Sequence, residues 1–135
     1  MTRRLRLFVV MGTVAMLGLV GFLYSSFHVT PQPDLVAAVV DRPNAALTAW
    51  ATAPPGQRPA AQAVLAAVQG TDTALYALPV PYGLGYDLLA CARAYTTVIY
   101  DLHHYVPTTD GRLQADIAAA IYSSAIVEAD YATAF

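Results

Sequence analysis

The sequence predicts an all-α protein: a single N-terminal transmembrane helix, then a small helical extramembrane domain that ends in a long antiparallel helical hairpin. Three observations support this prediction. Residues 7–27 contain no charged side chain, residues 86–106 and 112–133 carry apolar side chains at helical spacing, and proline and glycine separate the shorter segments. The length of 135 residues allows one domain and an anchor.

The membrane anchor is predicted at residues 5–27, after a basic N-terminus at residues 1–4. Arg6 is its only charged residue, and the 21 uncharged residues after it span roughly the 30 Å hydrocarbon core at about 1.5 Å per residue. A cleaved signal peptide has a shorter apolar region and ends at a small-x-small cleavage site, whereas residues 24–30 contain no Ala-x-Ala pattern. We therefore expect the anchor to be retained.

The arginines predict the orientation of this anchor. Arg3, Arg4 and Arg6 precede the apolar run, and the next arginine is Arg42. The positive-inside rule then keeps the N-terminus in the cytoplasm or the mitochondrial matrix. The predicted location is a bacterial cytoplasmic membrane or a mitochondrial inner membrane, with the C-terminal domain in the periplasm or the intermembrane space.

One stripe of the predicted anchor consists of small side chains. Ala15, Gly18, Gly21 and Ser25 fall within about a third of the helix circumference. Small residues on one stripe allow another transmembrane helix to approach closely, so we expect a helix of another subunit to pack here. The alternative explanation is that glycine and alanine are common in membrane helices in general.

Residues 28–33 are predicted to link the anchor to a helical domain at residues 34–135. Asp34 suits the N-cap of a first helix. Pro43 should end or kink that helix, because proline lacks the backbone donor that a helix interior needs.

The chain between this helix and the hairpin is rich in proline and glycine. Residues 53–59 contain three prolines and are predicted to break the helical structure. A helix is expected over residues 60–69, with Gly70 suited to the position after its end. Residues 71–85 combine a short apolar run with two prolines and two glycines, and an ordered loop is expected there.

The hairpin consists of two predicted helices, at about residues 86–106 and 112–133, joined by a compact turn. In each helix one apolar seam repeats every three or four residues, which is typical of antiparallel partners. The first seam comprises Leu88, Ala92, Tyr95, Ile99, Leu102 and Val106, and the second comprises Leu113, Ile117, Ala120, Ser124, Val127 and Tyr131. The second helix is apolar on another face as well, which predicts burial on most of its sides.

The composition argues for neighbours and against nucleic acid. Charged residues make up 12% of the chain, against about 25% in typical soluble domains. A surface with so few charges is expected to be covered by protein or lipid. Beyond residue 30 the chain has four arginines, no lysine and nine acidic residues, so it lacks the basic patch that phosphate neutralisation requires.

No catalytic, cofactor-binding or metal-binding residue is predicted, and the chain is not expected to be an enzyme. His103 and His104 are neighbours on a helix and point about 100° apart, so they cannot easily share one metal ion. Cys91 lies among alanine and leucine and is expected to be a buried apolar side chain. Arg93 is expected to lie opposite Glu128 and to form an ion pair with it.

Tyrosine is concentrated in the C-terminal half, where eight of the nine lie between residues 76 and 131. Tyrosine combines a large apolar area with one hydroxyl and is enriched at protein interfaces. Packing within the hairpin accounts for Tyr95 and Tyr131. The residues predicted to contact a partner are Tyr86, Tyr100, Tyr105, Tyr122 and Ile126.

These observations predict a non-catalytic, single-span accessory subunit of a larger membrane complex, most plausibly an energy-transducing one, respiratory or photosynthetic. The expected partners are the other subunits of that complex and the lipid bilayer. The alternative is a membrane-anchored helical module in the periplasm that binds a small ligand or a protein.

Overall fold

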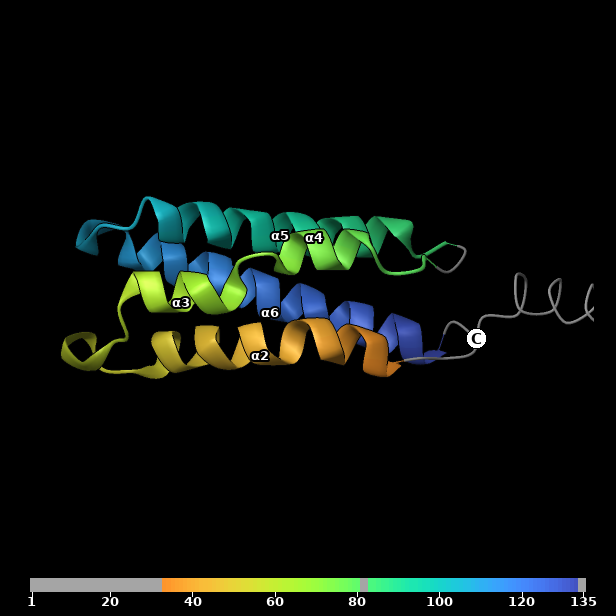
Figure 1. Ribbon diagram of the computed structural model, residues 1–135, viewed down its shortest axis with the longest axis horizontal. Coiled ribbons are helices and arrows are strands. Elements are labelled where there is room, and N and C mark those ends of the chain that lie inside the picture. Colours follow the sequence, from red (N-terminus) through yellow and green to blue (C-terminus); the bar gives the residue numbers. More distant parts are fainter. Residues whose placement is uncertain (1–32, 81–82, 134–135) are drawn as a thin grey trace, which may run out of the picture. The chain divides into compact units, whose positions relative to one another are not determined.

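The computed structural model describes residues 33–80 and 83–133 of the chain (Figure 1). Its elements are α2 (Pro33–Thr52), the 3-10 helix η1 (Pro55–Gln57), α3 (Ala61–Val68), α4 (Thr71–Tyr76), α5 (Gly85–His103), the 3-10 helix η2 (Pro107–Thr109) and α6 (Asp110–Thr133). Every regular element in these ranges is a helix, which confirms the all-α prediction.

The predicted anchor at residues 5–27 lies outside the described residues, as does its small-residue stripe of Ala15, Gly18, Gly21 and Ser25. Within residues 33–80 and 83–133, none of the helices combines the length and the apolar character needed for a bilayer crossing.

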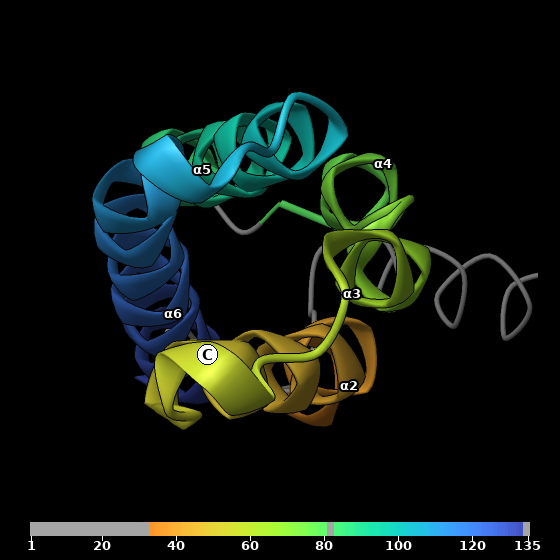
Figure 2. The ribbon, with the colours of Figure 1, turned by 90° about the vertical axis from the view of Figure 1, so that its left-hand side faces the viewer.

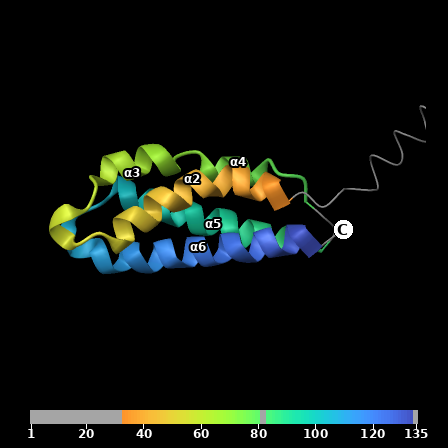
Figure 3. The same ribbon diagram turned by 90° about the horizontal axis from the view of Figure 1, so that it is seen from below.

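The described helices form an up-down-up-down bundle whose second member is broken in two. α2 runs away from the end that holds Pro33, α3 and α4 return, α5 runs out again, and α6 comes back (Figures 1 and 3). Viewed along its length, the bundle has four walls: α2, the α3–α4 pair, α5 and α6 (Figure 2). Each wall contacts both of its neighbours, and among single helices α5 and α6 share the most extensive contact.

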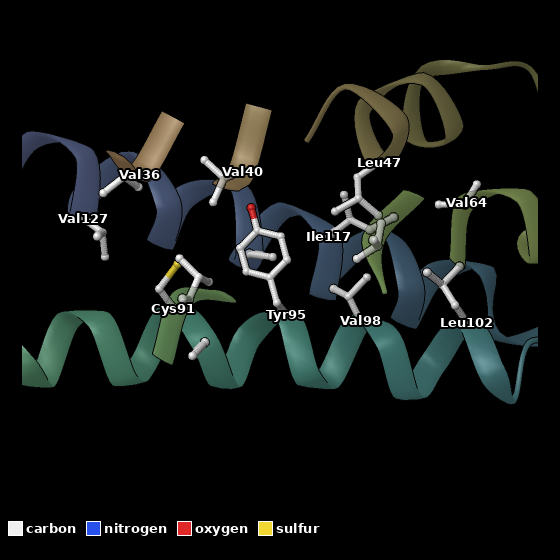
Figure 4. Packing of buried hydrophobic residues seen from close by; sticks show 14 of the residues in the cluster. Val36, Val40, Leu47, Val64, Cys91, Tyr95, Val98, Leu102, Ile117 and Val127 are labelled. Atoms are coloured by element: carbon white, nitrogen blue, oxygen red, sulfur yellow. The ribbon is translucent and has the colours of Figure 1, made fainter. Parts of the chain in front are cut away.

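The bundle core is built from one apolar side of each helix. Trp50, Tyr95 and Tyr131 are the largest fully buried side chains. In Figure 4, Cys91, Tyr95, Val98 and Leu102 project from α5 into the core that α2 and α6 also line. All six residues of the second predicted seam are buried on α6. On α5, Leu88, Ala92, Tyr95 and Leu102 are buried, Ile99 is half-buried and Val106 lies beyond the helix.

Pro43 lies inside α2 and is buried, and the helix continues through it to Thr52. The prediction that the helix could end there is therefore wrong. A proline in a helix interior removes one hydrogen bond and costs about 3 kcal/mol. Val36 and Val40 before it, and Leu47 and Trp50 after it, are all buried on the same side. At about 1.5–3 kcal/mol for each large apolar side chain, their burial outweighs that cost.

The predicted loop at residues 71–85 begins instead with a helix, α4 (Thr71–Tyr76). Leu75 is completely buried, and the buried Thr71 hydroxyl donates to the Val68 carbonyl oxygen at 2.6 Å. Gly70 precedes α4 with a φ of 86°, a left-handed conformation that glycine adopts without steric cost. The helix forms because the burial of Leu75 in the core stabilises it, and the local sequence does not reveal that contact.

The hairpin turn lies earlier in the chain than the sequence predicts and is one residue longer, at residues 104–109 instead of 107–111. α5 ends at His103, three residues before the expected boundary, and α6 begins at Asp110. Val106 has an extended backbone, with φ −136° and ψ 151°, as expected for a residue before proline. Pro107 thus removes the last turn from the predicted helix, and Val106 becomes exposed.

Candidate functional site

A polar cluster joins three helices in the middle of the core. The Tyr95 hydroxyl on α5 donates to the Asn44 side-chain oxygen on α2. The Asn44 amide donates in turn to the Ser124 hydroxyl on α6 at 3.0 Å, and Ser124 donates to the Ile121 carbonyl oxygen at 2.7 Å. Figure 4 shows the Tyr95 ring pointing away from α5 toward α2. Each hydroxyl in this cluster donates a hydrogen bond, so the cluster links α2, α5 and α6 to one another.

A second cluster closes the end of the bundle that holds the α5–α6 turn. The Arg58 guanidinium lies 4.3 Å from the centre of the Trp50 ring and donates to Asp110 Oδ2 at 2.8 Å. The Tyr105 hydroxyl donates to the other oxygen of Asp110. Its ring meets Trp50 edge-on at a centroid distance of 6.0 Å. Tyr105, which the sequence assigns to a partner interface, is half-buried and makes these contacts within the fold.

A buried carboxyl lies between α5 and α6. Asp101 is 5% exposed, its Oδ1 atom is 3.6 Å from Arg112 Nε, and its Oδ2 atom has no hydrogen-bond donor. Burial, and then the neighbouring Asp116 carboxyl, raise the pKa of Asp101 to about 6, against a smaller opposing effect of Arg112. These surroundings favour the protonated form of Asp101.

Two further acidic contacts lie toward the other end of α6. A hydrogen bond with Asp87, followed by burial and charge repulsion, raises the pKa of Asp130. Burial, followed by the charge of Asp41, raises the pKa of Glu128. These carboxyls face one another across helix contacts, and a cluster of acidic residues is not sufficient to define a catalytic site.

Arg93 and Glu128 do not form the expected ion pair. Within the described part of the chain, the ion pairs are Arg58–Asp110 and Arg112–Asp101. Arg93 is exposed on the outer face of α5, whereas Glu128 is close to Asp41 on the α2 side of α6. The two side chains lie on different sides of the hairpin, a difference that sequence separation alone does not reveal.

His103 and His104 lie at the end of α5 and are exposed. His103 is the last helical residue, and the His104 ring stacks on the Tyr100 ring at 4.2 Å with its Nδ1 atom 2.9 Å from the Tyr100 carbonyl oxygen. Among the described residues, no three His, Cys, Asp or Glu side chains are grouped so that they could hold a metal ion. Cys91 is fully buried, and burial raises the pKa of its thiol to about 12.

The predicted partner-contact residues do not form one patch. Tyr86 and Tyr100 are 82% and 58% exposed on α5, and Tyr122 is 69% exposed on α6. Ile126 is half-buried. Tyr86 and Tyr100 are on the same face of α5, because fourteen residues correspond to nearly four turns.

The outer face of α6 is almost free of charge. Tyr122 points opposite to the buried Leu113 and Tyr131, which are each nine residues, or two and a half turns, away. The exposed side chains around Tyr122 are those of Ala115, Ala118, Ala119, Ala125 and Ala129. We call these five alanines and Tyr122 the α6 outer face. The sequence predicts burial of a second apolar face of this helix, and no other described helix covers it.

Two exposed apolar residues were not singled out from the sequence. Tyr76 ends α4 and Val80 follows it, and they are 53% and 54% exposed. Tyr76 is part of a short apolar run, and its neighbour Leu75 is buried. The only signal in the sequence is their position beside prolines and glycines, which keep the chain at the surface.

Comparisons with protein-family models, with curated proteins and with solved structures found no match to this chain.

Proposed function

We propose that this chain is a non-catalytic, single-span accessory subunit of a larger membrane complex. In this proposal residues 5–27 cross the membrane and the stripe of Ala15, Gly18, Gly21 and Ser25 packs against a transmembrane helix of the complex. The helical bundle then contacts an extramembrane neighbour.

The observation that carries the proposal is the α6 outer face. A helix on the surface of a soluble domain normally turns charged residues toward water. Here Tyr122 and five alanines occupy that face along most of α6, and they point away from the core. Small side chains let another helix approach closely, while an exposed tyrosine offers a large apolar ring and a hydroxyl to a partner.

The host we propose is an energy-transducing complex, respiratory or photosynthetic. The bundle then lies in the periplasm or the intermembrane space, as the arginines before the apolar run predict. Extraction in mild detergent followed by native electrophoresis tests the host, because a respiratory or photosynthetic complex retains haem or chlorophyll absorbance in the band that contains the protein.

Site-specific photocrosslinking tests the interface. A benzophenone amino acid at Tyr122 in the full chain is expected to crosslink to one protein of the complex in intact membranes. The same amino acid at Gln62, exposed on α3 and outside the proposed interface, is the control and should give no such product. Equal crosslinking at both positions, or only lipid adducts at Tyr122, would refute the role of the α6 outer face.

A membrane-anchored helical binding module is the second candidate, and one observation favours it. The bundle has a continuous core, from Val36 on α2 to Tyr131 on α6, and a polar cluster of its own. The two candidates differ in what the bundle does without partners. If residues 31–135 alone are soluble, monomeric and cooperatively folded, the result supports the binding-module hypothesis and counts against the accessory-subunit hypothesis.

A further inference from the structure

One end of the bundle gathers the start of α2, the end of α4, the start of α5 and the end of α6 (Figure 1). We call it the anchor-proximal end, because the chain enters it from the predicted anchor. A hydrogen bond from the Tyr131 hydroxyl on α6 to the Pro79 carbonyl oxygen ties the segment after α4 to this end.

The anchor-proximal end exposes apolar and aromatic side chains. Tyr76, Val80 and Tyr86 are among the six large apolar residues that are most exposed in the described part of the chain. Along α5, the arginine nearest to Tyr86 is Arg93, about two helical turns away. The opposite end also exposes two large apolar residues, Tyr100 and Val106, but Arg58, Arg112, His103 and His104 lie at that end as well.

We propose that the anchor-proximal end rests on the outer surface of the lipid bilayer, with Tyr76, Val80 and Tyr86 in the headgroup region. This inference rests on the proposed function, since it requires the anchor. Five residues separate Phe27, the end of the predicted span, from Pro33, the start of α2. At no more than about 3.6 Å per residue, the start of α2 stays within roughly 20 Å of the membrane boundary.

The chemistry of these side chains fits a membrane interface. Tyrosine is enriched there because its ring enters the apolar region while its hydroxyl stays hydrated. The charged groups near this end include the carboxyl pair of Asp87 and Asp130. Contact with the bilayer should therefore occur on zwitterionic lipid and be insensitive to salt, unlike the binding of a basic surface to anionic lipid.

A pair of tryptophan variants in the full chain tests this contact. Tyr86→Trp places a probe at the anchor-proximal end. Tyr100→Trp places the same probe on the same face of α5, about 21 Å farther from that end. Trp50, buried near the other end of α2, contributes an equal background to both variants. Both proteins are reconstituted into phosphatidylcholine liposomes, with or without bromine on the lipid acyl chains, and circular dichroism checks that they fold.

The expected result is a loss of emission and a blue shift for Tyr86→Trp in brominated lipid, with no change for Tyr100→Trp. Tyr76→Trp should behave like Tyr86→Trp. Equal quenching at positions 86 and 100 would overturn the proposal, because the bundle would then lie flat. Quenching at neither position would also overturn it. Protection of position 86 from both brominated lipid and aqueous iodide would indicate that protein covers this end, and would equally refute lipid contact.

A carbonate wash of the liposomes separates these outcomes from failure of the proposed function. If the protein stays with the lipid but position 86 is not quenched, the anchor stands and only the lipid contact of the bundle is refuted. If the wash removes the protein, the anchor fails, and the proposed function and this inference fail together.

Discussion

The Arg58 guanidinium stacks on the Trp50 ring, with 4.3 Å between the guanidinium carbon and the ring centre. The same guanidinium forms an ion pair with Asp110, at the start of α6. The Arg58 side chain, from the segment after α2, therefore links the end of α2 to the start of α6. Cation–π and ion-pair contacts of partly buried groups each contribute about 0.5–2 kcal/mol, so this contact should be measurable.

Replacing Arg58 should destabilise the bundle. Arg58→Ala removes the stack on Trp50 and leaves Asp110 without its cation, so we expect a loss of about 1–3 kcal/mol in the free energy of unfolding. Arg58→Lys keeps the charge but not the planar stack and should fall between the wild type and alanine. Urea unfolding of the full chain in detergent, followed by Trp50 fluorescence, measures both. Arg93→Ala is the matched control, because exposed Arg93 should change stability by less than about 0.5 kcal/mol.

Asn44→Ala should be more damaging than its half-buried position suggests. The substitution removes the partner of the buried Tyr95 hydroxyl and the amide that donates to Ser124. Unpaired buried polar groups cost about 1–3 kcal/mol each, so we expect a loss of about 2–4 kcal/mol. The Asn44→Ala/Ser124→Ala double variant should lose less than the sum of the single variants. Strict additivity would show that the two side chains are not coupled.

Asp101 predicts a pH dependence of stability. Its pKa is raised to about 6 in the fold, above its ordinary value, so the native state binds this proton more tightly than the unfolded state. The resulting stabilisation is complete below about pH 4 and is lost as the pH rises through about 6, with a limit of about 3 kcal/mol. The raised pKa values of Asp130 and Glu128 act in the same direction.

Unfolding curves measured from pH 4 to pH 8 test this dependence. The unfolding free energy of the Asp101→Asn variant should depend less on pH than that of the wild type. A wild-type stability that rises with pH over this interval would contradict the prediction.

Two glycines allow the role of Gly70 to be isolated. A Cβ added at Gly70 or at Gly56 would meet no atom within 4 Å, but only Gly70 has a positive φ, of 86°. Gly70→Ala should cost about 1 kcal/mol through backbone strain, whereas Gly56→Ala should be neutral or slightly stabilising. Thermal unfolding of the two variants checks this contrast. Similar melting temperatures would mean that the left-handed turn before α4 is not needed.

The seam of α6 could be predicted completely from sequence, because it repeats at helical spacing without interruption and all of its members are buried. The predictions that a helix could end at Pro43 and that residues 71–76 form a loop failed for a shared reason: a local preference competes with packing, and the neighbours that decide the outcome are distant in sequence. At Val106 the cause is local, because the adjacent Pro107 ends the helix early. The sequence also could not separate Tyr105, which packs on Trp50, from Tyr86 and Tyr122, which face outward.

The helical class, the spacing of both hairpin seams and the low charge of residues 31–135 follow from the sequence, because each is a local property of composition or period. Packing in three dimensions was needed to show that α2 passes through Pro43, that Asn44 meets Tyr95 and Ser124, and that no other described helix covers the outer face of α6. The physical reason is that several helices here carry more than one apolar side, and only the packing of all of them selects the side that is buried.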